Sequence, residues 1–208
     1  MFLLVTDFSG AGVSIANNLS QAGALIDAAV ADGADFIATP EMTHLLQRSP
    51  KRLFSAITAE DKDSGLAYFR ALAVKHNLHI LIGSLAVLGE DGKALNRSYL
   101  IAPSGDILAR YDKIHLFDVD VADSEANYRE SRYTQAGKQA KVVQTPFANI
   151  GLSICFDLRF PVLFQQLSKL GANIITIPSA FTRVTGEAHW ETLLRARAIE
   201  TGSFVMAS

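Results

Sequence analysis

The sequence of 208 residues has one cysteine, Cys155, and therefore no pair that could form an internal disulfide. A chain without disulfides suits a reducing compartment, so we expect a cytoplasmic protein. The sequence also lacks an excess of charge of one sign, because 19 basic residues stand against 21 acidic ones. This balance argues against surfaces that bind nucleic acid or anionic membranes, and we expect neither partner.

Long hydrophobic runs are absent as well, and no apolar run approaches the length of a transmembrane helix. The apolar residues 2–5 are too few for a signal peptide and follow no basic segment. Without a secretory signal, we interpret the glycosylation-like motif Asn96-Arg97-Ser98 as a chance match. The histidines do not have the spacing of metal ligands, so we expect no metal site. They are His44, His76, His79, His115 and His189.

What the sequence does contain is an alternation of strand and helix patterns. It is 49% hydrophobic, which suits a full core, and we expect one domain over residues 1–208. The alternation, with a turn signal at 103–106 between two strands, predicts an α/β fold with a mixed sheet and a central hairpin. Apolar spacings of three and four predict helices over 15–30, 66–76, 162–170 and 187–200. Short apolar runs predict strands over 2–5, 36–38, 79–85, 98–101, 107–109, 141–144, 149–154, 173–177 and 204–206. Loops are expected over 43–62, with a helical turn near 53–57, and from 119 to about 138.

Three chemically distinct side chains each follow a predicted strand or apolar run: Glu41, Lys113 and Cys155. A cysteine hydrolase needs a nucleophile, a base for the thiol proton and a positive group for the developing oxyanion, and these residues supply one of each. Cys155 also lies between a strand and a helix that Pro161 can open. A helix N-terminus nearby would favour the thiolate.

Each of the three residues also has an ordinary structural interpretation. A lone cysteine is most often a buried packing residue. Glu41 could be the acidic residue at the start of a helix, and Lys113 could be a solvated surface lysine. Spacing alone leaves these alternatives open.

The residues around the three side chains are more specific. Residues 40–41, 111–118 and 151–161 resemble, in the same order, the three motif blocks of the nitrilase superfamily, the carbon–nitrogen hydrolases. Residues 178–182 and 185–200 look like its Nit branch, which includes amidases of deaminated glutathione and ω-amidases. The resemblance extends from residue 2 to residue 208.

This resemblance implies a four-layer αββα sandwich and a Glu–Lys–Cys triad that works without a metal or organic cofactor. Carried over by position, Glu41 is the general base and Lys113 stabilises the tetrahedral intermediate. Cys155 attacks the amide carbon, expels ammonia and leaves a thioester that water hydrolyses to a carboxylate. Family members also carry a second glutamate after the lysine block. Glu130 fits that position and would orient Lys113 or the attacking water.

Further residues are candidates for substrate contact because they lie close to the motifs in the sequence. They are Phe117, Phe156, Arg159, Phe181 and Thr182. The backbone N–H of Phe156 is a candidate oxyanion donor. Arg159 could bind a substrate carboxylate, but a salt bridge with Asp157 or a backbone cap is an equal alternative. We expect His115 to pack or hydrogen-bond near the lysine.

The resemblance predicts hydrolysis of a small linear, non-peptide amide, of the deaminated-glutathione type or an ω-amide of an α-keto acid, by a homodimer or larger assembly. Family members continue past the equivalent of Ser208, so we expect this chain to lack their C-terminal strands and tail. This leaves open a non-catalytic domain that binds a ligand or partner. A papain-like Cys–His enzyme is less favoured because no histidine follows a predicted strand. We expect Arg197 to have a structural or interface role, with Glu200 as its partner.

Overall fold

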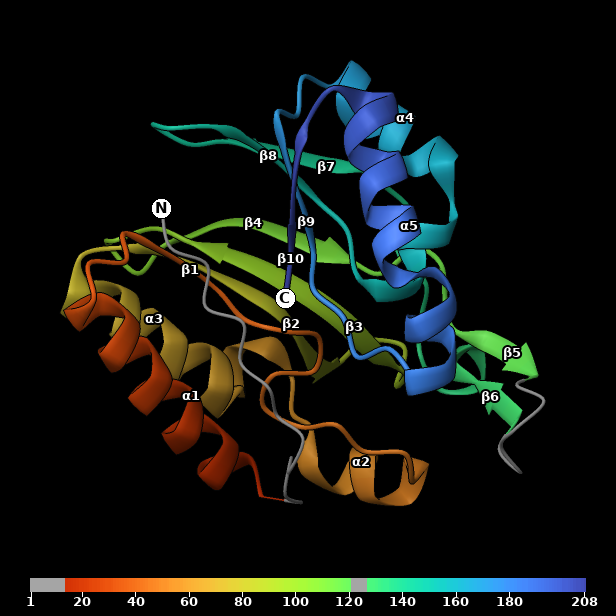
Figure 1. The fold of residues 1–208 in the computed structure, drawn as a ribbon. Coiled ribbons are helices and arrows are strands. Elements are labelled where there is room, and N and C mark those ends of the chain that lie inside the picture. Colours follow the sequence, from red (N-terminus) through yellow and green to blue (C-terminus); the bar gives the residue numbers. More distant parts are fainter. Residues whose placement is uncertain (1–13, 121–126) are drawn as a thin grey trace.

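The computed structural model describes residues 14–120 and 127–208, and its elements form four layers in the order α–β–β–α (Figure 1). Within these residues the strands make two four-stranded sheets and one two-stranded sheet. The expected α/β sandwich is confirmed. The strand predicted over residues 2–5 lies outside the described residues. In the described residues no helix has the length and apolar character needed to span a bilayer.

The first sheet has the order β1-β2-β3-β4. Its strands are β1 (Phe36–Ala38), β2 (His79–Leu88), β3 (Ala94–Ile101) and β4 (Ile107–Asp112). β1 pairs in parallel with β2, and β2, β3 and β4 pair antiparallel, which confirms the predicted hairpin. Because two antiparallel pairings separate β4 from β2, β4 runs in the same direction as β2 and β1. The carboxyl ends of β1 and β4 therefore lie at the same edge.

Helices α1 (Ile15–Ala31) and α3 (Ser64–His76) cover the outer face of this sheet (Figure 1). Each begins where the sequence supplies a cap. Ser14 accepts a hydrogen bond from the Asn17 N–H, and Asp63 accepts one from the Leu66 N–H. α3 ends at Asn77, which adopts the left-handed conformation. Apolar residues of both helices pack on the outward side chains of β2 and β3 in one buried cluster.

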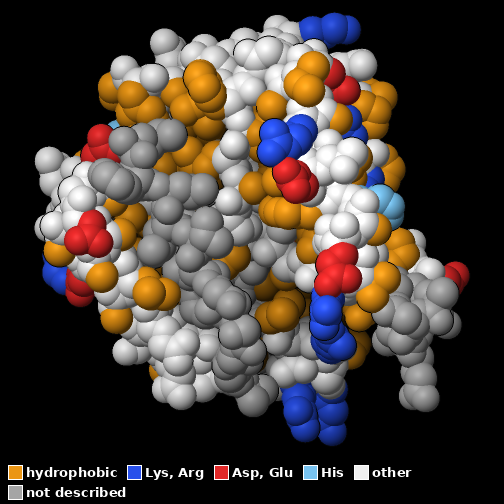
Figure 2. Space-filling model, viewed as in Figure 1, with side chains coloured by type: hydrophobic (Ala, Val, Ile, Leu, Met, Phe, Trp, Pro, Cys, Tyr) orange, Lys and Arg blue, Asp and Glu red, His pale blue; other side chains and the backbone are white. Residues whose placement is uncertain are grey.

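The second sheet has the order β10-β9-β8-β7. Its strands are β7 (Lys141–Gln144), β8 (Asn149–Leu152), β9 (Ile174–Ile177) and β10 (Phe204–Ala207). Helices α4 (Pro161–Lys169) and α5 (Arg183–Thr201) cover its outer face (Figure 1). Pro161 occupies the first turn of α4, where its missing N–H costs no helical bond. Acidic and basic side chains are interspersed along the α5 side of the face in Figure 2.

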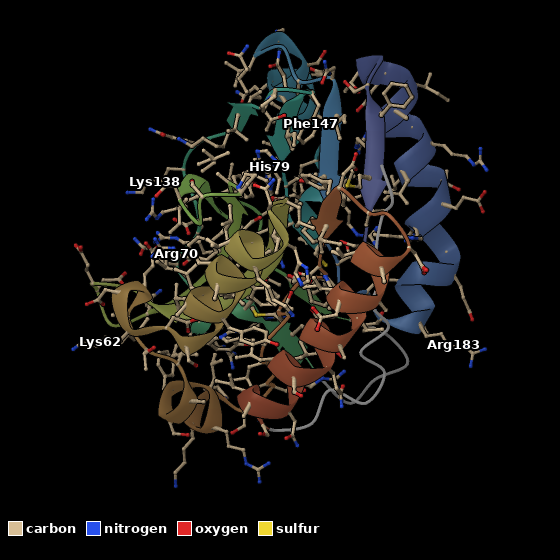
Figure 3. All side chains as sticks on the ribbon, turned by 90° about the vertical axis from the view of Figure 1, so that its left-hand side faces the viewer. Lys62, Arg70, His79, Lys138, Phe147 and Arg183 are labelled. Carbon is tan, nitrogen blue, oxygen red and sulfur yellow. The ribbon has the colours of Figure 1, made fainter. Side chains whose placement is uncertain are left out.

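The inner faces of the two sheets enclose a second core, which includes Leu81 and Leu100 from one sheet and Ile150 and Leu152 from the other. Because strand side chains alternate, Ile80 and Ile82 beside Leu81 face the helices instead. At one end of this core the ring of Phe147 contacts that of Phe36 edge-on with centroids 5.7 Å apart, and that of His79 with centroids 5.3 Å apart (Figure 3). The opposite end is where the strands lead to the candidate site.

Two regions that we predicted as loops contain regular elements. Residues 43–62 hold α2 (Pro50–Ala56) and the 3-10 helix η1 (Glu60–Lys62). The region from 119 to 138 holds β5 (Asp118–Asp120) paired with β6 (Asn127–Arg129), and the 3-10 helix η2 (Glu130–Arg132). These elements are short and polar, so they lack the apolar periodicity on which sequence prediction depends. β8 also ends at Leu152 rather than at 154.

Gly83 in β2 allows the two sheets to meet close to the site. A Cβ there would overlap the carbonyl oxygens of Thr39 and Pro40 and lie 2.6 Å from Pro178 Cβ. We expect Gly83→Ala to lower the free energy of unfolding by about 2 kcal/mol, because these backbone atoms must move. Gly186→Ala is the matched control, since its Cβ would lie 3.9 Å from Phe181 Cβ within α5. Denaturant unfolding of both variants tests this, and equal stability of Gly83→Ala and the wild type would contradict it.

Candidate active site

The strand ends bring Glu41, Lys113 and Cys155 together. Glu41 follows β1, Lys113 directly follows β4, and Cys155 follows β8. All three side chains are buried, with exposed fractions of 8%, 2% and 7%. Charged and nucleophilic groups are seldom buried unless they have partners, so their contacts decide what the site can do.

The Lys113 ammonium lies between two carboxylates. Its Nζ donates to Glu41 Oε1 at 2.9 Å and to Glu130 Oε2 at 3.0 Å. Glu130 also accepts a hydrogen bond of 2.7 Å from the Phe117 N–H. The structure therefore places Glu130 against the lysine.

The Glu41 carboxylate is held on both of its oxygens. Oε1 accepts the bond from Lys113 and a second of 2.9 Å from Asn96 Nδ2. Oε2 accepts a bond of 3.0 Å from the backbone N–H of Ala180, which follows β9. Residues from both sheets thus fix the carboxylate, which lines the same cavity as the Cys155 thiol.

Cys155 begins the 3-10 helix η3 (Cys155–Arg159) with a positive φ of 49°. This conformation is unfavourable for a residue with a Cβ and is a common feature of functional sites. The Cys155 N–H donates to the Pro178 carbonyl at 2.8 Å, and the preceding Ile154 N–H donates to Asp157 Oδ2 at 2.9 Å. The turn that presents the sulfur is therefore held on both sides.

Asp157 is fully buried and joins the cysteine turn to the lysine segment. Its Oδ2 also accepts a bond of 2.7 Å from the Tyr111 hydroxyl, and its Oδ1 accepts one of 2.9 Å from the His115 N–H. His115 Nδ1 lies 2.7 Å from the same Oδ1, as expected for a histidine that hydrogen-bonds near the lysine. These contacts fix the relative positions of the two segments.

The expected alternative of an Arg159–Asp157 salt bridge is wrong, because Asp157 is occupied by the partners just described. Arg159 Nη1 instead lies 3.1 Å from His189 Nδ1. Its guanidinium lies over the rings of Phe156 and Phe181, 5.8 and 5.7 Å from their centroids. Arg197 is structural as expected, since it donates to Glu200 at 2.9 Å and to the Leu158 carbonyl at 3.0 Å.

The electrostatics of the site correct the expectation of a thiolate. Burial raises the pKa of Cys155 well above its ordinary value, and the Glu41 charge raises it further against the opposing effect of Lys113. Burial also favours neutral Glu41, but Lys113 and the hydrogen bonds hold the pKa of Glu41 below its usual range. Burial alone would lower the pKa of Lys113, yet Glu41 and Glu130 raise it well above normal. The resting groups are therefore a thiol, a carboxylate and an ammonium.

These groups open onto a cavity of about 160 Å³. Its lining includes every residue that the sequence predicted for the site: Glu41, Lys113, Phe117, Glu130, Cys155, Phe156, Arg159, Phe181 and Thr182. In the described part of the chain no group of His, Cys, Asp or Glu side chains is arranged to hold a metal ion. The cavity can therefore present a thiol, an adjacent base and an ammonium to one small molecule.

Other residues of the site were not predicted from the sequence. Arg48, Tyr128, Arg129 and Tyr133 also line the cavity. Tyr128 and Arg129 adjoin Glu130 in the sequence, which was the available signal, whereas Arg48 lies in a segment predicted as loop. Asn96 was interpreted only as a chance sequon, because the predicted strand began at 98 rather than at Ala94. Asparagine is depleted in strands, which explains the late start.

Comparison with known proteins gives consistent findings. The sequence pattern of the family described as carbon-nitrogen hydrolase matches residues 12–208. The deaminated glutathione amidase of Synechocystis sp. PCC 6803 is 42% identical over 201 residues, which cover 93% of this chain and 72% of that protein. The probable hydrolase nit2 of Schizosaccharomyces pombe is 38% identical over 196 residues, covering 93% and 71%. Saccharomyces cerevisiae Nit3, a member of branch 10 of the nitrilase superfamily, superposes with a TM-score of 0.85 at 26% identity, covering 99% of this chain and 73% of that one.

Proposed function

The chain belongs to the carbon–nitrogen hydrolase family of the nitrilase superfamily, and from this premise we propose that residues 1–208 act as one amidase domain with Glu41, Lys113 and Cys155 as catalytic residues. The observation that carries the proposal is the buried Lys113 ammonium between Glu41 and Glu130, with the thiol against the same Glu41 carboxylate. A thiol beside a base and a cation, in a cavity, is the arrangement that nucleophilic attack on an amide requires.

In the first half of the proposed reaction, Glu41 takes the thiol proton as the Cys155 sulfur attacks the amide carbon. The carbonyl oxygen gains negative charge, which the Lys113 ammonium and the Phe156 N–H stabilise. The carbon–nitrogen bond then breaks while Glu41 returns its proton to the departing nitrogen. Ammonia leaves, and the acyl group remains on Cys155 as a thioester.

In the second half, Glu41 takes a proton from a water molecule that attacks the thioester carbon. Lys113 again faces the oxyanion, and Glu130 keeps the ammonium directed at it. The carbon–sulfur bond breaks, the sulfur recovers its proton from Glu41, and the carboxylic acid leaves. One amide and one water thus give one carboxylic acid and one ammonia, which in water become a carboxylate and an ammonium ion, with no cofactor consumed. The thiol must stay reduced, which supports a cytoplasmic location.

The substrate that we favour is a linear amide bearing a carboxylate, of the deaminated-glutathione type. The similar Synechocystis protein carries that amidase name. Three arginines, Arg48, Arg129 and Arg159, line the cavity and can attract an anionic substrate. The second candidate is an ω-amide of an α-keto acid, which carries a carboxylate too. We further propose a homodimer or larger assembly, in which the exposed Ile199 on α5 is a candidate contact residue.

A panel of amides tests the function. The wild-type chain is incubated with deaminated glutathione, α-ketoglutaramate and simple aliphatic amides, while ammonia is assayed and the intact mass is recorded. We expect ammonia release and an acyl adduct that peptide mapping places on Cys155. Folded protein that releases no ammonia and carries no adduct would overturn the proposal in favour of a non-catalytic binding domain.

Arg159 is the arginine for which we expect a specificity role. Removing a hydrogen bond to a charged group costs about 1.5–3 kcal/mol, so Arg159→Ala should raise KM for a carboxylate-bearing amide by about 10- to 100-fold. The effect on an uncharged aliphatic amide should be small. Steady-state kinetics on both substrates measure this, with Arg195→Ala, an exposed arginine paired with Glu191, as the control. Equal losses on both amides would show that Arg159 acts only by holding His189.

A further inference from the structure

Asn96 in β3 closes a ring of polar groups around the candidate site. Its side chain is 1% exposed. Its Nδ2 donates to Glu41 Oε1 at 2.9 Å and to Glu130 Oε1 at 3.3 Å. Lys113 Nζ donates to the same two carboxylates. Each of the two nitrogens therefore bridges both glutamates, and the four side chains form a closed ring.

The charges in this ring explain why an amide suits the position. Two carboxylates stand against one ammonium, so the ring carries an excess negative charge in a buried place. Like charges in such a site raise each other's pKa unless donors offset the repulsion. Asn96 adds two N–H donors and no charge. An aspartate there would add a third carboxylate, and an apolar residue would remove a donor from each glutamate.

The orientation of the amide is also fixed. Rotating it by 180° would place Oδ1 against two carboxylate oxygens, which cannot donate to it. Within the described residues, Asn96 Oδ1 has no hydrogen-bond partner. The hydrogen bonds of the Asn96 side chain therefore all go from Nδ2 to Glu41 and Glu130. The Asn96 carbonyl accepts the Lys113 N–H at 3.0 Å. One residue thus touches all three charged members of the ring.

We propose that Asn96 is a positioning residue for the amidase reaction. Its side chain holds the Glu41 carboxylate where it can accept the thiol proton, and it keeps the Glu130 carboxylate hydrogen-bonded to Lys113. The proposal rests on the proposed function. Asn96 itself does not contact the reacting atoms. Its effect passes through Glu41, and the charged or titratable groups that face Glu41 in the described residues are Lys113, Cys155 and, across the ring, Glu130.

A pH signature follows from this role. Burial tends to raise the pKa of Glu41, and the bond from Asn96 is among the contacts that lower it. The reaction needs the carboxylate, so activity is lost as pH falls through the pKa of Glu41. Removing the Asn96 donor raises that pKa and should move the acidic limb of kcat/KM to higher pH.

Two variants test the proposal against the wild type on an amide that it hydrolyses. Asn96→Leu keeps the size but removes the donors, and we expect kcat/KM to fall about 10- to 100-fold with the acidic limb at higher pH. Asn96→Asp can donate only when protonated. Its activity should survive only where residue 96 is protonated while Glu41 is still ionised, and it should fall as pH rises further, because the ionised side chain repels Glu41 and Glu130. The two variants therefore shift the profile in different ways.

Ser98→Ala is the matched control on the same strand. Ser98 is as buried as Asn96, but its hydroxyl donates to the Ile82 carbonyl rather than to Glu41 or Glu130. It should keep the wild-type pH profile even where it lowers stability. If the wild type is active and both Asn96 variants keep its pH profile of kcat/KM, the role of Asn96 is overturned while the proposed function stands. A wild type inactive on every amide would overturn the proposed function instead. If Asn96→Leu does not fold, the profile of Asn96→Asp decides.

Discussion

Replacing Cys155 by alanine or by serine is expected to reduce ammonia release from every amide by at least about 10⁴-fold, since no other group can form the thioester. Serine is no substitute, because its hydroxyl is far less acidic than a thiol and the site already raises the pKa of the thiol through burial and the Glu41 charge. The ammonia assay and the intact mass measure the loss, and neither variant should carry an acyl adduct.

Both Cys155 variants should remain folded. The positive φ of 49° at this position is already borne by a residue with a Cβ, so alanine adds no backbone strain. The backbone bond from residue 155 to the Pro178 carbonyl does not depend on the side chain. Thermal unfolding should therefore give a Tm close to that of the wild type. Full turnover by a folded Cys155→Ala would disprove the covalent mechanism.

The clustering of Glu41, Lys113 and Cys155 could be predicted because each residue lies directly in a strong local pattern. Short apolar runs mark β1, β4 and β8, and a polar residue just past such a run tends to lie at a sheet edge. The family motifs then fixed which residues belong together. The four-layer architecture followed from the same resemblance, whereas periodicity by itself gave only an α/β fold with a mixed sheet.

The remaining features depend on contacts between distant segments. Asn96 is 55 residues from Glu41 and 34 from Glu130, and its strand begins in polar residues without apolar alternation. The resting state of Cys155 was mispredicted for a similar reason. A nearby helix N-terminus is visible in the sequence, but burial and the charge of Glu41, which raise the pKa, come from segments far along the chain. Local patterns cannot report either effect.

Glu41→Gln should lower ammonia release by about 10²- to 10⁴-fold, the usual contribution of a general base. Glutamine keeps the size of the side chain but can neither take the thiol proton nor return it to the leaving nitrogen. In the wild type the pKa of Glu41 lies below its usual range, so activity should persist into mildly acidic solution and fall only as pH drops through that pKa. The pH dependence of kcat/KM for both proteins measures this. Glu60→Gln, which breaks ion pairs with Arg97 and Arg110 outside the cavity, should retain activity.

Alkylation of Cys155 by iodoacetamide shows whether Glu41→Gln is inactive because it lacks the general base or because its pocket has collapsed. Alkylation needs only the thiolate, and it requires no proton for a leaving nitrogen. Removing the Glu41 charge removes one cause that raises the pKa of Cys155 and leaves the opposing Lys113 in place. The thiolate of Glu41→Gln should then form at lower pH than in the wild type, and alkylation should persist while ammonia release is lost. Loss of both reactivities would mean that glutamine disrupts the site, and retention of ammonia release would mean that Glu41 is not the base.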